Sequence, residues 1–225
     1  MISSLQRLLE QLLDLIYPER CAVCGTTGSL FCAACCSRLT PYPPEAAPMG
    51  LEAMLVAWLY GDEVRQAIHA LKYQRRRRMA LLLADALADD WSPPPGDALI
   101  PVPLHPDRLA ERGFNQAEEL ARRLSQRWRI PLCRQGLIRE RDTGHQARLG
   151  RRARQSNVAG AFFWSDHRPP PERVLLVDDV LTTGATLVAC ADALRRAGTH
   201  EVRAVALARS RAPNRRAQRT MSVLQ

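Results

Sequence analysis

The chain has 225 residues, of which 46% are apolar and 24% are charged, and its formal net charge is +9. This balance is typical of a globular protein in water, and the length suits one ordinary domain with a small accessory module. No stretch approaches the ~18 consecutive apolar residues that a membrane-spanning helix requires, so the sequence predicts no membrane span.

The first sixteen residues, MISSLQRLLEQLLDLI, place polar side chains among the leucines. Their apolar residues recur at helical spacing, which predicts a short amphipathic helix. A secretory signal peptide needs a basic start, an unbroken apolar core and a small-residue cleavage site, and this segment has none of them. We therefore expect the protein in the cytoplasm.

Two C-x2-C pairs follow within the segment CAVCGTTGSLFCAAC. The thiolates of one such pair can face the same metal ion, and two pairs complete a tetrahedral zinc site. Gly25, directly after the second cysteine, permits the tight turn that such a pair makes. A four-cysteine site leaves no open position on the metal, so the zinc is predicted to be structural. The predicted ligands are Cys21, Cys24, Cys32 and Cys35.

The cysteines also allow other interpretations. Disulfide bonds are the alternative to zinc, although a cytoplasmic chain disfavours them. Cys36 can compete with Cys35 as a ligand, because the two are adjacent. Cys133 and Cys190 stand in apolar surroundings and are interpreted as packing residues.

Two proline-rich breaks divide the first half of the chain, PYPPEAAPMG at 41–50 and SPPPGD at 92–97. The first of them ends the cysteine module. Apolar periodicity predicts the elements on either side of the second break. These are a strand over 53–60, a helix that starts at Asp62 and resumes over 79–91, and a strand over 98–103.

The second half of the chain alternates helices and strands. In order, it predicts a loop over 105–115, a helix over 117–128, a loop over 141–160, a strand over 174–177, a helix over 186–197 and a strand over 202–208. Strands separated by helices predict right-handed crossovers and a parallel sheet with helices on both faces. The last fourteen residues are expected to form a flexible basic tail.

The segment VLLVDDVLTTGATL, residues 174–187, ends an apolar strand on two adjacent acids. A central strand of a parallel sheet is buried on both faces, and ligands bind at its carboxyl end, where we expect Asp178 and Asp179. A cation or a polar ligand must offset the repulsion between the two acids. The TTGAT turn offers hydroxyls, backbone N–H groups and a helix N-terminus, which favour a phosphate. The pattern predicts a sugar-phosphate site; capping of the helix by the acids is the alternative, and no P-loop pattern is present.

Arginines supply most of the positive charge, and they cluster. Such clusters favour polyanionic partners, either nucleic acid or phosphorylated small molecules. Aromatic residues make up 5% of the chain, so contacts to nucleic acid would be directed mainly at phosphates. The alternative is that the arginines solvate helix faces. The clusters are Arg75–Arg78; Arg122, Arg123, Arg127 and Arg129; Arg151, Arg152 and Arg154; and Arg209, Arg211, Arg215, Arg216 and Arg219.

The segment VLLVDDVLTTGATL resembles the phosphoribosyl pyrophosphate (PRPP) motif of type I phosphoribosyltransferases. The segments IPVPLHPDRLAERGFNQAEELA and TGHQARLGRRARQSNVAGAF and the four-cysteine module are similar to the ComF/GntX family, which is associated with competence and the use of external DNA. Ala22 departs from the proline often found in the first cysteine pair, which leaves the ligands intact. The resemblance implies an α/β, type I phosphoribosyltransferase fold with a small amino-terminal zinc module. The implied divisions are 1–48 for the helix and zinc module, 50–211 for the phosphoribosyltransferase domain and 212–225 for the tail.

The resemblance also implies roles for individual residues. Asp178 and Asp179 would hold the ribose hydroxyls of PRPP and take part in catalysis. Residues 141–156, with His145 and Gln146, match the mobile loop that closes over the reacting centre, although a histidine in such a loop is commonly a surface residue. The 5′-phosphate would lie against Thr182, Thr183, Gly184, Ala185 and Thr186. The pyrophosphate, which carries Mg²⁺, would contact Leu104, His105, Arg108 and Arg112.

Three functions are compatible with these residues. One is an enzyme that transfers phosphoribosyl from PRPP to an acceptor that the sequence does not identify. Another is a non-catalytic accessory protein that binds single-stranded DNA through its arginine clusters and acts with other DNA-uptake proteins. The third is a regulator that senses PRPP. Pyrophosphate release in the presence of Mg²⁺ separates the first from the others, and strongly salt-dependent DNA binding identifies the second.

Overall fold

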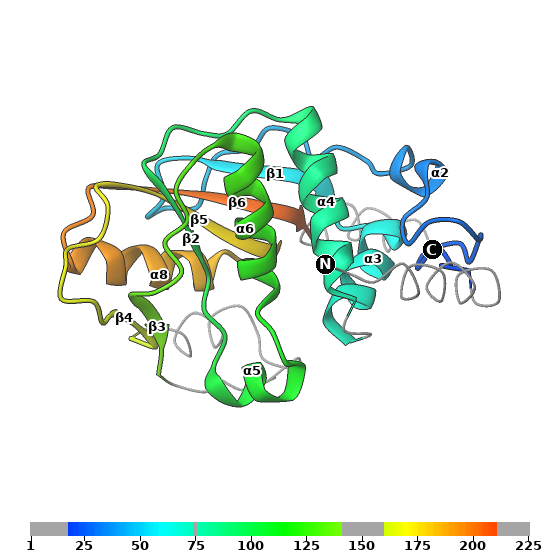
Figure 1. Cartoon of the computed structure of the whole chain (residues 1–225). Coiled ribbons are helices and arrows are strands. Elements are labelled where there is room, and N and C mark those ends of the chain that lie inside the picture. Colours follow the sequence, from blue (N-terminus) through cyan, green and yellow to red (C-terminus); the bar gives the residue numbers. More distant parts are fainter. Residues whose placement is uncertain (1–17, 74–75, 141–159, 211–225) are drawn as a thin grey trace, which may run out of the picture.

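A parallel β-sheet forms the centre of the fold (Figure 1). The computed structural model describes residues 18–73, 76–140 and 160–210. Within these residues the sheet has four strands in the order β1–β6–β5–β2, and all neighbouring strands are parallel. Parallel neighbours require crossover connections, so this order confirms the predicted α/β architecture. The strands are β1 (Met54–Leu59), β2 (Ala98–Pro101), β5 (Arg173–Leu181) and β6 (Glu201–Arg209).

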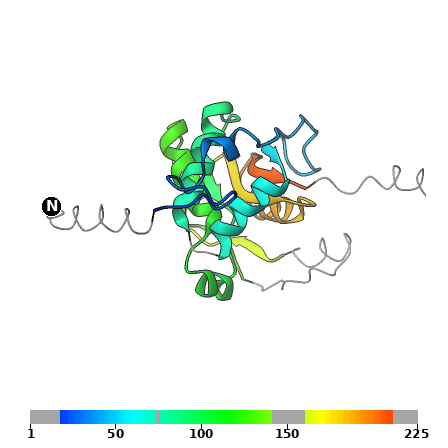
Figure 2. The ribbon, with the colours of Figure 1, turned by 90° about the vertical axis from the view of Figure 1, so that its right-hand side faces the viewer.

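Helices cover both faces of this sheet (Figure 2). On one face α3, α4 and α6 share a core with Leu175 and Val177 of β5. On the other face α8 and the antiparallel hairpin β3–β4 pack with Val174 and Leu176, because side chains alternate along a strand. The elements are α2 (Ala33–Cys36), α3 (Asp62–Tyr73), α4 (Arg77–Asp90), α5 (Pro106–Arg112), α6 (Gln116–Trp128), α8 (Ala185–Arg196), β3 (Leu137–Arg139) and β4 (Phe162–Trp164).

Strand β5 is longer than the apolar run that predicts it. Residues 174–177 are buried, as expected for a central strand. Pairing with β6 continues past the two acids to Leu181, which lies opposite Arg209. The acids therefore lie within the carboxyl-terminal half of the strand, and their side chains leave it on opposite faces.

The predicted loop over 105–115 contains helix α5, so the loop assignment is wrong for residues 106–112. No residue of α5 is buried, and the segment therefore lacks the apolar periodicity that predicts a helix. Its ends are capped instead: the His105 side chain accepts the N–H of Asp107, and Gly113 closes the helix with a φ of 79°.

Hairpin β3–β4 is a second element that the sequence did not predict. Each of its strands has three residues, which is too short for a reliable alternation of apolar and polar positions. Most of the predicted loop over 141–160 separates these strands and lies outside the described residues, as do the predicted amino-terminal helix and the basic tail.

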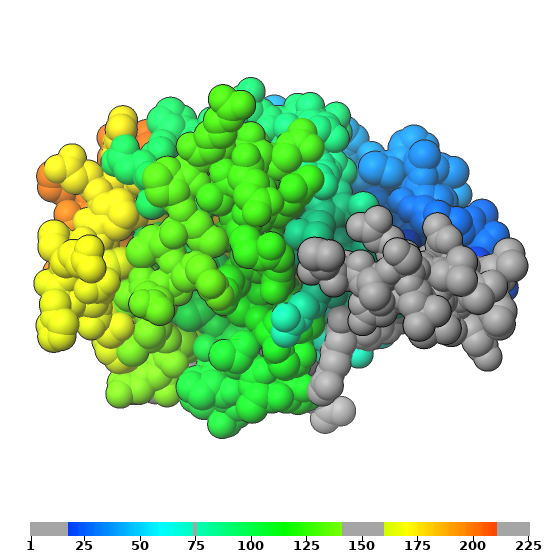
Figure 3. Space-filling view, in the orientation of Figure 1, coloured from blue at the N-terminus to red at the C-terminus, as the bar shows by residue number. Residues whose placement is uncertain are grey.

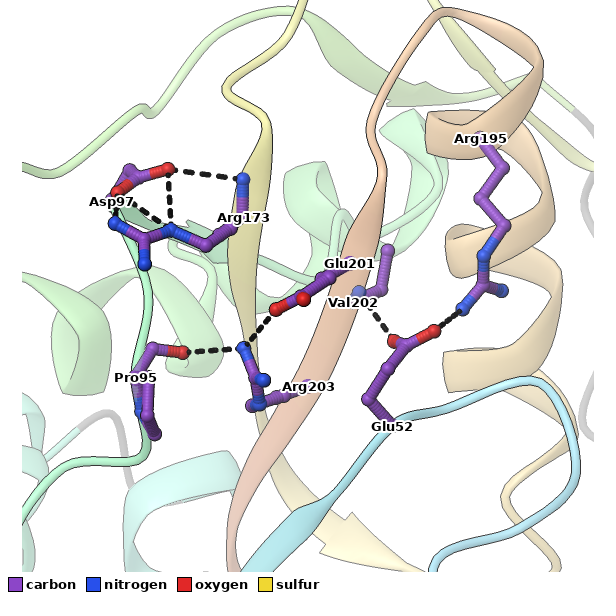
Figure 4. A network of polar contacts seen from close by, with 8 residues as sticks. All are labelled: Glu52, Pro95, Asp97, Arg173, Arg195, Glu201, Val202 and Arg203. Carbon is purple, nitrogen blue, oxygen red and sulfur yellow. Dashed lines mark hydrogen bonds and ion pairs between the residues drawn. The ribbon is translucent and has the colours of Figure 1, made fainter.

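Ion pairs and hydrogen bonds connect neighbouring strands at the amino-terminal edge of the sheet (Figure 4). The Arg173 guanidinium, at the start of β5, donates to both carboxylate oxygens of Asp97, which precedes β2. This contact lowers the pKa of Asp97. Arg203 of β6 donates to the carbonyl of Pro95, 3.0 Å away, and pairs with Glu201. The contacts tie three neighbouring strands together at the end opposite the acid pair.

A second part of this network fixes the segment that precedes β1 (Figure 4). Glu52 accepts the backbone N–H of Val202 at 2.6 Å and a guanidinium N–H of Arg195 at 2.7 Å. Arg195 also donates to the carbonyl of Gly50. Residues 48–52 are thereby held along helix α8, whose amino-terminal end Pro48 touches.

The cysteine module packs directly against the sheet domain. Cys21, Phe31 and Cys35 are buried in the same apolar cluster as Trp58 of β1. Glu19 links the module to α4, because its carboxylate accepts the N–H of Leu30 and pairs with an arginine of that helix. None of the helices in the described part of the chain has the length and apolarity needed to cross a bilayer.

Candidate functional site

A buried ion pair occupies the carboxyl end of β5. Lys72 Nζ, in the last turn of α3, lies 2.7 Å from Asp179 Oδ2, and Asp179 is 8% exposed. Burial alone would lower the pKa of Lys72, but the charge of Asp179 outweighs it and raises that pKa. Lys72 is the cation that the acid pair requires, and the sequence did not identify it.

Asp178 lies on the opposite face of β5. Its Oδ1 accepts the backbone N–H of Asp179 at 2.8 Å. Burial, followed by the negative charge of Asp179, raises the pKa of Asp178 to about 7. Asp178 is thus divided between its acid and its carboxylate near neutral pH, whereas Asp179 is paired with Lys72. The two acids offer different chemistry to a ligand.

The loop after β5 opens helix α8. Gly184 is the residue before the helix and has a φ of 82°, a conformation that favours glycine. The Thr183 hydroxyl accepts the N–H of Ala185, while Thr182 is exposed. The first-turn N–H groups of an α-helix have no partner within the helix, so this end of α8 presents donors and a positive dipole at the carboxyl edge of the sheet. The helix begins one residue before the predicted Thr186.

Gly184 also fixes how closely the amino-terminal segment approaches this loop. A Cβ at position 184 would lie 2.9 Å from Pro48 Cγ. Gly184→Ala therefore combines an unfavourable backbone conformation, worth about 1–2 kcal/mol, with an overlap worth roughly 1–3 kcal/mol. Gly113→Ala is the matched control, because Gly113 has a similar φ of 79° and no atom within 4 Å of its Cβ position. Urea denaturation should show a larger loss of unfolding free energy for Gly184→Ala; equal losses would mean that Pro48 does not constrain the loop.

The segment after β2 lies beside the acid pair. The N–H of Val102 donates to the Val177 carbonyl at 2.9 Å, which places Leu104 and His105 beyond the end of β2, next to the half of β5 that carries the acids. His105 Nδ1 is used as the cap of α5, and its side chain is 13% exposed. Leu104 and His105 are thus two predicted pyrophosphate residues that directly follow strand β2. The other two, Arg108 and Arg112, lie on α5. Arg108 Nη1 is 3.8 Å from a glutamate carboxylate of the same helix.

The four predicted zinc ligands come together. Their Sγ atoms all lie within 4.8 Å of one another, and Cys24 Sγ is 3.6 Å from Cys32 Sγ. A zinc ion bound tetrahedrally by thiolates would separate the sulfurs by about 3.8 Å, given Zn–S bonds of ~2.3 Å, so the arrangement fits such an ion. Cys36, the proposed competitor of Cys35, is not part of the cluster.

The electrostatics of the cluster also favour a cation. Contacts with Thr26 lower the pKa of Cys24 to about 6, whereas burial and the neighbouring thiols raise the pKa of Cys35 to about 12. Four thiolates this close repel one another unless a cation neutralises them. Gly25 makes the predicted turn, with a φ of 77° and its N–H donated to the Cys21 carbonyl.

A cavity of about 380 Å³ lies between the cysteine module and the carboxyl ends of β1 and β6. Arg38 and Leu39 line it from the module, and Tyr60 and Ser210 line it from the strand ends. Arg38 pairs with Glu63 at its wall, at 3.1 Å. None of the residues predicted to bind PRPP or pyrophosphate lines this cavity, although it lies at the same carboxyl edge of the sheet as Asp178.

Several of the clustered arginines are engaged within the protein. Arg123 and Arg127 of α6 both pair with Asp85 of α4, at 2.8 and 3.1 Å, and so join two helices. Arg122 pairs with Glu119 of its own helix, and Arg209 of β6 pairs with an acid of the proline-rich segment. For these residues the interpretation as helix- and strand-surface charges fits the structure. The clusters at 151–154 and beyond 210 lie outside the described residues.

Comparison with known proteins agrees with this arrangement. Residues 109–224 match the family described as phosphoribosyl transferase domain. The chain is 31% identical to competence protein F of Haemophilus influenzae over 84% of each chain, and 29% identical to the DNA utilization protein YhgH of Escherichia coli K12 over 85% of this chain and 83% of that protein. A purine phosphoribosyltransferase from Pyrococcus horikoshii has 20% identity and a TM-score of 0.33, with 69% of this chain and 78% of the other covered. The chain belongs to the competence protein F family and has its type I phosphoribosyltransferase domain.

Proposed function

We propose that the chain binds PRPP at the carboxyl end of β5 and transfers its phosphoribosyl group to an acceptor. The observation that supports this most strongly is the order of features along β5 and α8. Two acids in the strand, one of them paired with Lys72, are followed directly by a glycine turn and a helix N-terminus. That combination offers acceptors for ribose hydroxyls beside donors for a phosphate.

The roles follow from this placement. The hydroxyls of the ribose donate to Asp178 and Asp179, and the 5′-phosphate accepts N–H groups of residues 182–186. Mg²⁺ enters on the diphosphate, because magnesium prefers substrate phosphates to a cage of protein ligands. In the reaction the bond between C1 and the pyrophosphate oxygen breaks, pyrophosphate leaves with the bonding electrons, and the acceptor bonds to C1. Positioning and electrostatic stabilisation of C1 and the leaving group are the contribution of the protein.

Zinc is the metal that we propose for the four-cysteine cluster. Thiolate ligands at C-x2-C spacing suit Zn²⁺, and a site closed by four sulfurs has no position for a substrate. Its role is structural, because the cluster joins the core that contains Trp58. In this proposal the zinc module also shapes the side of the domain from which the acceptor enters.

The setting that we propose is the use of external DNA in the cytoplasm. Two relatives are named for competence and for DNA utilization. This connection favours a second candidate function, in which the chain binds single-stranded DNA, and DNA-uptake proteins are then its partners. Arg78 provides one observation for it: although it pairs with Glu19, its side chain stays 72% exposed at the start of α4, in the run of arginines over 75–78.

The DNA-binding candidate makes a prediction about salt. Replacing Arg76 and Arg78 by Gln should weaken binding of single-stranded DNA equally for all sequences and flatten its salt dependence by about 0.7 per lost phosphate contact. Replacing Arg122 and Arg134 by Gln is the matched control, because it removes two exposed, glutamate-paired arginines outside the run at 75–78. Fluorescence anisotropy over a range of salt concentrations measures the slope. An unchanged slope would mean that the arginines at 75–78 are solvated surface residues that do not contact DNA.

Calorimetry tests the proposed function itself. Titration with PRPP and Mg²⁺ should give one saturable site per chain, and pyrophosphate release on addition of an acceptor identifies an enzyme. Binding without release under all acceptors tested would instead favour the PRPP-sensing regulator. Repeating the titration with single-stranded DNA present shows whether the two ligands are coupled. Absence of PRPP binding would overturn the proposal.

A further inference from the structure

A buried amide without a partner lies at the start of α6. Gln116 is 2% exposed, and its Nε2 has no hydrogen-bond partner among the residues that the structure describes. Its Oε1 accepts a guanidinium N–H of Arg112 at 2.8 Å. A buried donor left unpaired costs about 1–3 kcal/mol, so an acceptor for Nε2 is expected in the functional state.

Hydrogen bonds of the preceding residue, Asn115, connect this end of α6 to the edge of the sheet that carries the acids. Asn115 caps α6 and donates through Nδ2 to the Val102 carbonyl at 3.0 Å. Val102 is joined to Val177, the residue before Asp178, by a backbone hydrogen bond of 2.9 Å. The amino-terminal end of α6 therefore lies at the carboxyl edge of β2 and β5. Figure 3 shows α5 and the start of α6 (green) on the surface between the cysteine module (blue) and the segment after β4 (yellow).

Arg112, the partner of this amide, also lies near the end of α3 that carries Lys72. The Arg112 guanidinium lies 5.8 Å from the ring centre of Tyr73, and Tyr73 follows Lys72, which pairs with Asp179. The positive charge of Arg112 disfavours protonated Lys72 and so lowers the pKa of Lys72. The charge of Asp179 has a larger effect in the opposite direction, and the pKa of Lys72 is raised overall. No carboxylate is paired with Arg112 among the described residues.

The acids of the first turn of α6 do not cancel this positive charge. Glu118 accepts from Arg134 at 2.7 Å, and Glu119 pairs with Arg122. Both carboxylates are therefore neutralised by other arginines. The dipole of α6, a helix of thirteen residues, adds positive potential at the same end.

We propose that Lys72, Arg112 and Gln116 form a subsite for the diphosphate group of PRPP. This inference rests on the proposed function and adds Lys72 and Gln116 to the residues expected at that group. A phosphate oxygen accepts the free Nε2–H of Gln116 and offsets the charges of Lys72 and Arg112. Asp179 and Lys72 lie on the α3–α6 face of β5, whereas α8 begins on the other face. The ribose is then held between two phosphate sites, one on each side of β5.

Separate probes test the subsite without depending on the complete substrate. We would titrate inorganic pyrophosphate and ribose 5-phosphate independently, each with Mg²⁺, into wild type and Gln116→Leu. Leucine keeps the volume and removes the unpaired donor, so pyrophosphate affinity should fall about five- to tenfold, as expected for one hydrogen bond to a charged group. Ribose 5-phosphate affinity should stay within about twofold. Thermal stability should change little, because the variant removes the orphaned Nε2 donor together with the Oε1 acceptor of Arg112. Unchanged pyrophosphate affinity in Gln116→Leu would overturn the role of Gln116.

A pair of variants tests Lys72. Lys72→Met alone leaves Asp179 buried without its cation, and the protein should lose stability for that reason. Lys72→Met with Asp179→Asn removes both charges, so stability should recover. If Lys72 contacts the diphosphate, pyrophosphate affinity stays at least about tenfold low in the double variant, a loss expected for a charge-assisted contact. Recovery of both pyrophosphate binding and stability would show that Lys72 only neutralises Asp179 and does not contact the diphosphate.

The probes also separate this inference from the proposed function. Arg122→Gln, on α6, controls for the loss of one positive charge and should leave both affinities unchanged, since Arg122 is paired with Glu119. A wild-type protein that binds PRPP and ribose 5-phosphate but not pyrophosphate would overturn the subsite and leave the proposed function standing. A wild-type protein that binds neither PRPP nor ribose 5-phosphate would overturn the proposed function.

Discussion

Replacing both Asp178 and Asp179 by Asn should lower the affinity for PRPP by about 100-fold or more. Each substitution keeps the size of the side chain. Above pH ~8, where Asp178 with its pKa of about 7 is ionised, each also removes a charged acceptor, and a hydrogen bond to a charged group contributes about 1.5–3 kcal/mol. Two such losses correspond to two or more decades in the dissociation constant. Calorimetric titration with PRPP and Mg²⁺ measures the change. Wild-type affinity in the double variant would show that the acids do not hold the ribose.

The two single variants should differ in stability, because the acids have different partners. Burial raises the pKa of Asp178 from 3.8 to about 7, so its ionisation destabilises the fold as the pH rises between these values. Asp178→Asn should therefore match wild type below pH ~4 and exceed it above pH ~7, by roughly 1–3 kcal/mol given that Asp178 is only partly buried. Asp179→Asn should be less stable than wild type, because Lys72 loses its partner.

Melting temperatures measured from pH 4 to pH 8 test both statements. Repulsion between adjacent acids, considered from the sequence alone, predicts that removing either charge stabilises the protein. Because Asp179 is paired with Lys72, we expect stabilisation only when the charge of Asp178 is removed. A destabilised Asp178→Asn variant at pH 8 would mean that its carboxylate, rather than its protonated form, is the one stabilised in the folded protein.

Replacing Cys35 by Ser should remove the metal and disrupt the amino-terminal module. Metal binding to a four-thiolate site contributes on the order of 10 kcal/mol to the folding of a small module. Cys35 and Cys21 belong to the core that contains Trp58, so the disruption should extend to helix α3 and strand β1. Elemental analysis should find one zinc per wild-type chain and none in Cys35→Ser, and limited proteolysis should cut the variant between residues 18 and 40.

Cys36→Ser is the matched control, because Cys36 is adjacent but lies outside the cluster. It should retain one zinc per chain and the proteolysis pattern of wild type. A wild-type protein that is free of metal, with its cysteine module fully folded, would contradict the proposed zinc site. Loss of zinc in Cys36→Ser would show that Cys36, rather than Cys35, is a ligand.

Local patterns predicted the longer elements that bury an apolar face, but not the three-residue strands β3 and β4, which bury Leu137 and Phe162. The run at 174–177 identified the central strand, since a strand buried on both faces has no polar alternation. Helix α5 was missed for the complementary reason that it buries nothing, although its caps were readable: Pro106 at the first position, Asp107 in the first turn and Gly113 after the end. For short surface helices, capping residues are therefore a better sequence signal than apolar periodicity.

The site was predicted where its residues are consecutive in the chain and missed where they are not. The acids and the TTGAT turn form one segment, and the two cysteine pairs form another. Lys72 is remote from Asp179 in sequence, and a lysine in the last turn of a helix is common because it favours the dipole. Gln116 likewise stands beside a helix cap, where a polar residue is ordinary. Only the packing of α3 and α6 on the sheet brings these residues to the acid pair.

A crystal structure of the chain with PRPP and Mg²⁺ tests the central claim most directly. We expect the 5′-phosphate against the N–H groups of residues 182–186, the ribose hydroxyls within hydrogen-bond distance of Asp178 and Asp179, and the diphosphate at Lys72, Arg112 and Gln116. PRPP bound in the cavity beside Arg38 and Tyr60, with the turn at 182–186 left empty, would contradict the account.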